Sequence, residues 1–466
     1  MFKKFNLVVA IFAVPVIVEA KVLPEEAAQL GVTGTPLTPM GAIRAGNEDG
    51  SIPEWTGGIK APPSGWEKGK MHGDFDPYKD DAPLFIITAQ NYKQYGDKLT
   101  VGQKTMFDRY PENYKMIVYP TRRSAAYPDE IYSATINNAT RTVALPDYGG
   151  LDGYGMFGGD LPAGVAFPIP KSGLEAQYSH QTMYTGKYYR REGKAINAYT
   201  NGQIVVGDIV EYMMFPQQMS VQERDQKLDW LKDAWFGLSI DIKGPARLVG
   251  PLTLAKATLT PTELYAYQYA AGQRRVRVAP DVGSYDNPAM GSDGLRTGDD
   301  RYFLFGKLDR YEFKLVGKKE LLVPYNSYKL AQSSVKIADI MKYPTLNQDL
   351  PRYELHRVWV VEATLRSGES HQYAKRVLYY DEDSWTALLQ DVYDKRGEYW
   401  RFMEAFMINF WELPAIDYWG DVHYDIPSGR YSTYTSWYNE TKPPEYDVYL
   451  DKQFWSPQGL RLLGTR

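Results

Sequence analysis

The chain has 466 residues, of which 44% are hydrophobic and 24% are charged, and its formal net charge is −4. A mildly acidic chain without a basic stretch does not favour nucleic acid or an anionic membrane surface as its main partner. The absence of cysteine excludes disulfide bonds, thiolate metal sites and cysteine nucleophiles.

The first 20 residues have the layout of a secretory signal peptide. Lys3 and Lys4 form a basic start, residues 5–18 are almost entirely apolar, and Ala20 ends a pattern that a signal peptidase cleaves. The apolar run is shorter than the roughly 20 residues of an ordinary membrane span, and no cysteine follows it to carry a lipid. We therefore expect a mature chain that begins at Lys21 and is soluble and non-lipidated in a bacterial periplasm. An uncleaved anchor helix is the alternative.

Residues 21–114 are rich in Pro, Gly and Trp and show little periodicity, which is typical of an irregular arm. A short helix is expected within this arm, over residues 88–99. Strands are predicted over 115–121, 130–136, 142–145, 203–215 and 252–259. Ser172 and Glu175 have the spacing of a capping box, which predicts a helix from there to about Tyr184. Residues 262–278 fit either a short helix or a hairpin.

The last third of the chain predicts an antiparallel meander. Two hairpins turn at residues 367–368 and 395–397, and further strands follow at short spacing. The strand after the second turn alternates, with one apolar face made of Trp400, Phe402, Phe406, Ile408 and Phe410. The opposite face, with Tyr399, Arg401 and Met403, is expected to meet water. A sheet of this width curls, so we predict a mainly β, α+β fold. In it, a few helices cover a concave apolar face.

No metal, cofactor or catalytic site is predicted. A two-residue turn at 367–368 would place His371 opposite Thr364 and His356 opposite Tyr379, several rungs apart, so these histidines do not form a metal pair. The G-x-G-x-x-G match at 153–158 lacks the helix that a phosphate site needs. The acidic loop at 281–300 is expected to be solvated, and weak calcium binding by it is left open.

Five blocks of the sequence resemble the recurrent blocks of domain-of-unknown-function family 1329. They are AGNEDGSIPEWTGGI (45–59), GVAFPIPKSGLEAQYSH (164–180), GQRRVRVAPD (272–281), YEFKLVGKKELLVPYNSYKL (311–330) and RYELHRVWVVEATL (352–365). The resemblance implies a fold like that of the periplasmic lipoprotein carriers LolA and LolB, an incomplete β-barrel with helices over a hydrophobic cavity. It also implies an inner-membrane exporter of the resistance-nodulation-division type and an outer-membrane protein as partners. The chain departs from the family at residues 177–180, where QYSH replaces an aromatic-Asn-His run.

The residues of the first of these blocks do not suggest a catalytic site. Its turn-forming and anchoring residues are Asn47, Asp49, Gly50, Pro53, Trp55, Gly57 and Gly58. We interpret it as structural, an arm that Trp55 pins across the sheet, with a docking site for a partner as the alternative.

The resulting hypothesis is a single domain over residues 21–466 that carries a lipid-like molecule in an apolar cavity. The ligand-binding residues predicted for it are Trp400, Phe402, Phe406, Ile408 and Phe410. A periplasmic hydrolase acting on lipid or glycan is the alternative from another class, and it would need a cleft with a strongly perturbed acid or base. A passive subunit of an export complex is also compatible with the sequence.

Overall fold

The computed structural model describes residues 22–155, 162–220, 222–224, 230–231, 233–245, 251–260, 262–280, 282, 285–436, 442–446, 448 and 450–465. The predicted signal peptide, the predicted start at Lys21 and the second half of the 153–158 motif lie outside these residues. Within them, no helix has both the length and the apolar character needed to cross a bilayer.

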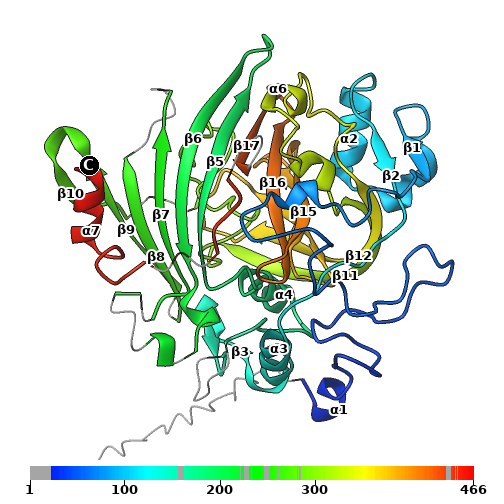
Figure 1. The fold of residues 1–466 in the computed structure, drawn as a ribbon, viewed down its shortest axis with the longest axis horizontal. Coiled ribbons are helices and arrows are strands. Elements are labelled where there is room, and N and C mark those ends of the chain that lie inside the picture. The colour runs from blue at the N-terminus through cyan, green and yellow to red at the C-terminus, as the bar shows by residue number, and fades with distance from the viewer. Residues whose placement is uncertain are drawn as a thin grey trace, which may run out of the picture.

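A large, mainly antiparallel sheet dominates the fold (Figure 1). Its strands are β1 (Phe85–Ile87), β2 (Met116–Val118), β5 (Tyr188–Ala198), β6 (Ile204–Met214), β7 (Phe236–Lys243), β8 (Leu252–Leu259), β9 (Thr262–Ala270), β10 (Arg275–Val278), β11 (Tyr311–Pro324), β12 (Tyr353–Leu365), β13 (Lys375–Asp381), β14 (Ala387–Tyr393), β15 (Tyr399–Phe410), β16 (Ala415–Asp425) and β17 (Arg430–Ser436). Their order is β1-β2-β12-β13-β14-β15-β16-β17-β5-β6-β7-β8-β9-β10, and β11 pairs with β12. The described sheet is therefore open, with β1 and β10 at its two ends. It is also mixed, because β2 and β12 pair in parallel.

The predicted meander is confirmed, since β12 to β17 pair with one another in sequence order. The ambiguous residues 262–278 form the β9–β10 hairpin. A separate two-stranded ribbon consists of β3 (Val143–Ala144) and β4 (Leu151–Asp152).

Six α-helices and six 3-10 helices are described. They are α1 (Pro24–Ala27), α2 (Val101–Arg109), α3 (Asp129–Arg141), α4 (Gly173–Gln181), α6 (Ile337–Ile340), α7 (Pro457–Gly464), η1 (His72–Asp74), η2 (Tyr92–Lys98), η3 (Pro146–Tyr148), η4 (Pro216–Gln218), η5 (Ala271–Gln273) and η6 (Tyr328–Ala331). The predicted start of α4 is confirmed, because the Ser172 hydroxyl accepts a hydrogen bond from the Glu175 N–H at 3.2 Å. The N-terminal arm contains α2, whose capping residue Thr100 accepts from the Gln103 N–H.

The strand predicted at residues 130–136 is wrong, because this segment lies within α3. Pro128 precedes the helix, and acidic residues occupy its first turn. Their negative charges stabilise the helix by interacting with the positive end of its dipole. The buried residues Ile131, Thr135 and Asn138 repeat at helical spacing. The β-branched content of the segment suggested a strand, but its burial period is that of a helix.

The predicted register of the β12–β13 hairpin is also wrong. Thr364 pairs with Lys375 and not with His371. The chain turns after Arg366, but residues 370–373 leave the ladder, and the Tyr373 hydroxyl donates to Asp300 at 2.8 Å. A buried polar contact with a distant loop therefore shifts the register by four residues.

The expectation that one face of β15 meets water is wrong as well. Arg401 and Met403 are buried, and so are the apolar residues that alternate with them. One face of β15 packs against α2 and η1 of the N-terminal arm. The opposite face carries Arg401, which donates to the buried Tyr373 hydroxyl. Because both faces are covered, strand alternation alone does not locate a solvent side here.

Candidate functional site

An apolar cavity of about 450 Å³, the β7–β9 pocket, lies between one end of the sheet and the loop of residues 285–305. Its apolar wall includes Phe236, Leu238, Ile240, Ala255, Leu264 and Phe305. The volume falls within the roughly 300–1,000 Å³ that small-molecule sites occupy. Its size and lining suit an apolar ligand.

Strand alternation and one small residue create this space. Leu238 pairs with Ala255, and Ile240 pairs with Thr253, so the four side chains share one face of the sheet. The methyl side chain of Ala255 fills little of the volume opposite Leu238. A larger residue at Ala255 would occupy the pocket.

The loop that covers the pocket ends in a buried stretch, residues 299–305, which we call the plug segment. The His180 ring of α4 lies between two carbonyl oxygens, with Nδ1 2.9 Å from the Trp385 oxygen and Nε2 2.9 Å from the Tyr302 oxygen. Burial lowers the pKa of His180 to about 4, so the ring is neutral at neutral pH and donates to one carbonyl at a time. The helix and the plug segment are thereby joined through a buried polar contact.

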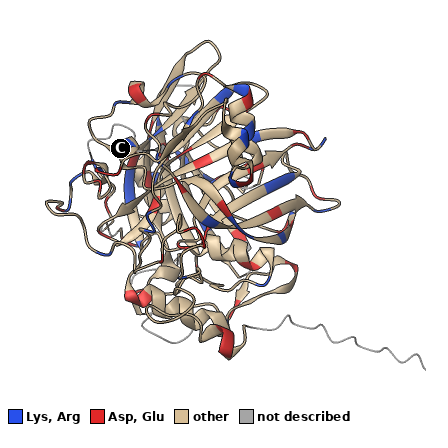
Figure 2. Ribbon diagram, turned by 90° about the vertical axis from the view of Figure 1, so that its right-hand side faces the viewer, with Lys and Arg blue, Asp and Glu red and all other residues tan. Residues whose placement is uncertain are grey.

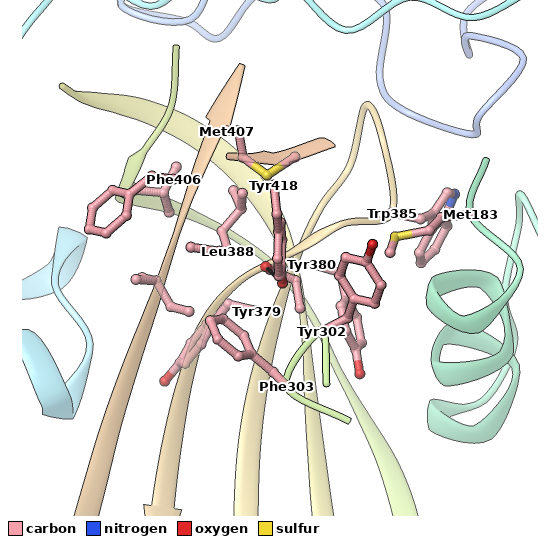
Figure 3. Packing of buried hydrophobic residues seen from close by; sticks show 14 of the residues in the cluster. Met183, Tyr302, Phe303, Tyr379, Tyr380, Trp385, Leu388, Phe406, Met407 and Tyr418 are labelled. Carbon is pink, nitrogen blue, oxygen red and sulfur yellow. Dashed lines mark hydrogen bonds between the residues drawn. The ribbon is translucent and has the colours of Figure 1, made fainter. Parts of the chain in front are cut away.

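Aromatic side chains of the plug segment pack into the sheet (Figure 3). The ring centroids of Tyr302 and Tyr418 are 4.9 Å apart, and those of Phe303 and Tyr418 are 5.8 Å apart. The ring centroids of Phe305 and Trp235 are 4.3 Å apart, and Phe305 also lines the pocket. This loop, as well as helices, thus packs on the inner face of the sheet. The pocket is the space next to the plug segment that these side chains leave unoccupied.

The acidic loop is not simply solvated. Asp299 and Asp300 are buried, and Arg376 donates to both carboxylates, at 2.7 and 3.1 Å. Burial alone would raise the pKa of Asp299, but Arg376 and His371 hold it well below its usual range. Asp286 and Asp293 also have arginine partners, and Asp281 lies outside the described residues. The described carboxylates of this loop therefore form ion pairs.

Two arginines of the same loop line the pocket. Arg301 is held by both carboxylate oxygens of Glu211, at 2.7 and 2.8 Å, and by the Tyr189 hydroxyl. Arg296 is 3% exposed, and its guanidinium carbon lies 4.3 Å from the centre of the Tyr434 ring. The apolar pocket therefore carries positive charge in its wall.

The residues predicted from sequence to bind ligand lie elsewhere, and none of the five lines the β7–β9 pocket. Phe402, Phe406, Ile408 and Phe410 are fully buried, and Trp400 is half-buried. A Cβ placed on Gly102 of α2 would lie 2.0 Å from the Phe402 ring, which shows how closely the two pack. The Phe410 ring lies 5.0 Å from His72. Their role in ligand binding stays a prediction, and the structure gives them partners in the protein core.

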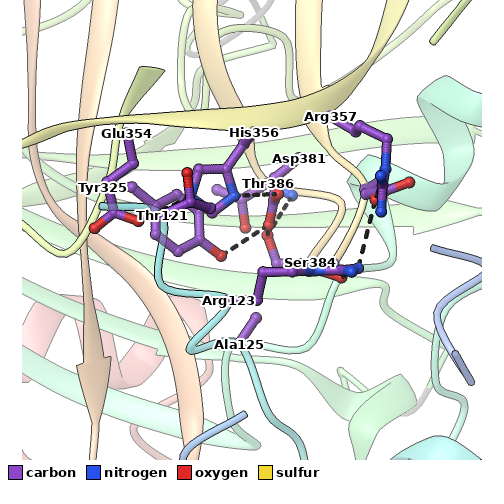
Figure 4. Close-up of polar contacts among 12 residues, drawn as sticks. Thr121, Arg123, Ala125, Tyr325, Glu354, His356, Arg357, Asp381, Ser384 and Thr386 are labelled. Carbon is purple, nitrogen blue, oxygen red and sulfur yellow. Dashed lines mark hydrogen bonds and ion pairs between the residues drawn. The ribbon is translucent and has the colours of Figure 1, made fainter. Parts of the chain in front are cut away.

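The signature block of residues 45–59 lies against a buried charged cluster (Figure 4). Arg123 donates to the carbonyl oxygens of Arg44 and Pro53, and Arg357 donates to those of Ile43 and Ala45. These arginines are themselves paired with Asp383 and Glu382, which are also buried. Buried side chains thus hold the backbone of the arm.

Within the block, each predicted residue has a local contact or a turn position. Trp55 is buried and donates its indole N–H to the Ala125 oxygen. The Asn47 and Asp49 side chains accept from the backbone N–H groups of Ile52 and Ser51. Gly50, Gly57 and Gly58 have positive φ, and Gly50 and Pro53 line a second cavity of about 590 Å³ beside β1 and β2. These contacts describe an arm fixed to the sheet, and its docking role stays a prediction.

His356, Asp381 and Asp383 place potential ligand atoms within 4.8 Å of one another. Arg123 donates to both oxygens of Asp383, at 2.8 and 2.7 Å. Burial and the neighbouring Asp383 raise the pKa of Asp381 to about 6. An arginine already neutralises one carboxylate, so the cluster is explained as an ion-pair network that anchors the arm.

Four buried carboxyl groups among the described residues, Asp381, Asp391, Glu404 and Asp417, have a pKa raised by burial, the property that the hydrolase alternative needs. Burial raises the pKa of Asp381 and of Asp391 to about 6 and that of Glu404 to about 7. None of the four lines the two cavities above or a third, more polar one of about 400 Å³ near residues 342–349. The enzyme alternative thus stays a hypothesis, because none of these three cavities is lined by a carboxyl group with a raised pKa.

Sequence reasoning missed the β7–β9 pocket. The alternation of side chains in β7 and β8 was a usable signal for one of its walls. The pocket also needs the loop of residues 285–305, which begins more than 25 positions after β8 ends. Figure 2 shows positive and negative residues interspersed along the strands, so the charge pattern does not mark the site either.

Comparison with known proteins identifies relatives over most of the chain. The sequence model of the family described as "Protein of unknown function (DUF1329)" matches residues 86–461. The uncharacterized protein PA3922 of Pseudomonas aeruginosa is 40% identical over 451 residues, which cover 96% of this chain and 95% of that protein.

Two solved structures are more distant. A DUF1329 family protein from Desulfovibrio piger is 14% identical, with a TM-score of 0.42, and the match covers 62% of this chain and 97% of that one. A LolA superfamily protein from Nitrosomonas europaea is 10% identical, with a TM-score of 0.37 and coverage of 62% and 98%.

Proposed function

Because the chain belongs to the DUF1329 family, whose description names no activity, we propose a function from the residues of its own site. It is a periplasmic carrier that binds a lipid-like hydrophobic molecule in the β7–β9 pocket. The observation that carries this proposal is the apolar cavity of about 450 Å³ under the loop of residues 285–305. The secretory layout of the first 20 residues supports the compartment.

Packing is the main physical argument for a ligand. Protein interiors are packed as densely as organic crystals, with few voids larger than a water molecule. A core of this size does not need an apolar cavity of several hundred cubic ångströms for stability, and each unfilled contact costs dispersion energy. A carrier does need such a space, because the ligand replaces the missing contacts. An inner-membrane exporter and an outer-membrane protein are the partners that we propose for delivery.

Lipid analysis tests the proposal directly. Protein purified from its own host is extracted with organic solvent, and the extract is analysed by mass spectrometry. We expect an apolar molecule in near-stoichiometric amount. In parallel, the delipidated protein is titrated with the neutral fluorescent probe N-phenyl-1-naphthylamine. If the wild type neither retains a lipid nor takes up the probe, the carrier proposal fails.

A variant whose pocket is filled by a larger side chain tests whether the probe binds there. Ala255→Phe places a ring opposite Leu238 and should lower the affinity for the probe at least tenfold, while thermal unfolding stays cooperative. Ala61→Phe, at an exposed position, is the control and should bind the probe like the wild type. Equal binding by all three proteins would place the probe outside the β7–β9 pocket.

The other end of the sheet favours a second candidate, a subunit of an export complex. β1 pairs only with β2 in the described sheet. Leu84, which lines the 590 Å³ cavity, is 60% exposed, and Ile86 is 46% exposed. A free strand edge with apolar neighbours can pair with a strand of another protein. Ile86→Lys should shift the protein from a large envelope complex to the free form in native electrophoresis and leave probe uptake unchanged. If the variant and the wild type migrate alike, this candidate fails.

A further inference from the structure

Arg296 is a buried cation that lines the β7–β9 pocket, and two of its three guanidinium nitrogens lack a hydrogen-bond acceptor among the described residues. Its side chain is 3% exposed. Its Nε and Nη1 atoms have no hydrogen-bond partner among the residues that the structure describes. Nη2 has a long contact of 3.5 Å with the Asp300 carbonyl oxygen. A guanidinium carries five N–H donors, and leaving them unpaired in a dry environment is costly.

The neighbouring charges do not satisfy this side chain. Arg296 has no carboxylate within the 4.0 Å of a salt bridge among the described residues, although its charge helps to hold the pKa of the buried Asp421 below its usual range. Burial, followed by the positive charge of Arg296, lowers the pKa of His423. A second buried arginine of the pocket wall, Arg301, is paired through both terminal nitrogens with Glu211 and Tyr189, and only its Nε lacks a partner among the described residues. Among the described residues, Arg296 therefore differs from Arg301 in having two unpaired nitrogens, Nε and Nη1, and no carboxylate partner.

We propose that Arg296 binds the anionic head of an amphiphilic ligand whose apolar chain fills the β7–β9 pocket. This inference rests on the proposed carrier function and specifies the class of its cargo, an apolar chain that ends in a carboxylate or a phosphate. Leu238, Ile240 and Ala255 contact the chain, and the Nε and Nη1 hydrogens pair with the anionic oxygens. Arginine suits this role because it stays charged and its planar group matches both kinds of head.

The geometry also explains why the charge is tolerated in an apolar wall. A buried charge is destabilising unless it is paired and hydrogen-bonded. The Tyr434 ring, 4.3 Å from the guanidinium carbon, offers a cation–π contact that offsets part of this cost without using an N–H group. The pairing that remains open is the one that an anionic ligand supplies.

The test compares three ligands of equal chain length. Delipidated wild-type protein loaded with N-phenyl-1-naphthylamine is titrated with palmitate, hexadecyl phosphate and hexadecanol, each below its aggregation concentration. A hydrogen bond to a charged group is worth a factor of about 10 to 100 in affinity, so both anions should displace the probe at least tenfold better than the alcohol. Tighter binding of palmitate assigns a carboxylate head, and tighter binding of hexadecyl phosphate assigns a phosphate head. Equal displacement by all three would overturn the inference but leave the carrier proposal intact, whereas no displacement by any would count against both.

Variants of the arginine separate binding from structure. Arg296→Met should abolish the preference for anions and leave hexadecanol binding unchanged, and Arg296→Lys should keep part of the preference. Arg275→Gln, at an exposed arginine of β10 outside the lining of the pocket, is the control and should keep the full preference. Thermal unfolding of each ligand-free variant checks that it still folds cooperatively. An equal loss of all three ligands by the folded Arg296→Met variant would assign Arg296 a structural role and overturn the inference.

Discussion

The substitution Glu404→Gln should make the protein more stable above neutral pH. Glu404 lies on β15 and is fully buried, and one of its oxygens, Oε1, accepts hydrogen bonds from the hydroxyl groups of Tyr114 and Tyr353, at 3.1 and 3.0 Å. Its other oxygen has no partner among the described residues. Burial raises the pKa of Glu404 from 4.5 to about 7, although the two tyrosine hydrogen bonds oppose the shift.

The magnitude follows from linkage between protonation and folding. Below pH 4.5 the carboxyl group is protonated in both the folded and the unfolded chain, so it adds no pH dependence. As the pH rises towards 7, the unfolded chain releases this proton first, and the free energy of unfolding falls. One pKa unit corresponds to about 1.4 kcal/mol, so above pH 7 the charged carboxylate costs about 3 kcal/mol. Glutamine keeps the acceptor oxygen for both tyrosines and cannot ionise.

The assay is thermal unfolding of the wild type and of Glu404→Gln between pH 5 and pH 8. Unfolding entropy is about 2 cal/mol/K per residue, so about 3 kcal/mol corresponds to roughly 3 °C for a chain of this length. The variant should therefore melt about 3 °C higher than the wild type at pH 8 and within about 1 °C at pH 5. Glu398→Gln, at an exposed position of the same hairpin, reports the effect of losing one negative charge. A difference that does not change with pH would refute the reasoning.

Three further substitutions test the anchoring of the arm and the packing of the sheet, with thermal unfolding as the measurement. Gly58→Ala should destabilise the fold by about 2 kcal/mol or more, because its Cβ would lie 2.1 Å from a backbone oxygen at a φ of +68°. Gly57→Ala, with φ +113° and open space around it, should cost less, and equal losses would contradict the steric argument. Arg123→Met should cost about 3–5 kcal/mol, since it leaves buried carboxylates unpaired, whereas Lys60→Met at an exposed pair should cost less than about 1 kcal/mol. Phe402→Asp should remove the cooperative transition, because it buries a charge in packed core. A folded Phe402→Asp protein that no longer takes up probe would instead support the ligand role predicted from sequence.

The sequence alone predicted elements whose signals are local. The hairpin meander from β12 to β17 follows from strands at short spacing and turn residues between them, and the start of α4 follows from the capping hydroxyl of Ser172. Even the error at α3 was local. The acidic first turn after Pro128 and the spacing of Ile131, Thr135 and Asn138 carry the helical signal, whereas the β-branched residues of the same segment favour a strand.

Only the tertiary structure decided the register, the burial and the site. The pairing of Thr364 with Lys375 depends on Tyr373, which leaves the ladder to bond Asp300 of a loop more than seventy residues earlier. Both faces of β15 are buried because the N-terminal arm, some 300 positions away, covers the apolar one. Periodicity reports that a side chain is apolar, but it does not report which distant segment packs on it.

The β7–β9 pocket depends on such distant contacts throughout. Its walls come from β7, β8, β9, β10 and β17 and from a loop that Arg376 and His180 hold in place. Nothing in the residues around Arg296 distinguishes it from the paired Arg301, five positions later. Whether an arginine has a hydrogen-bond acceptor depends on where the fold places the acceptor groups of distant segments. An unpaired cation in an apolar wall is therefore a property of the fold, and no local pattern in the sequence encodes it.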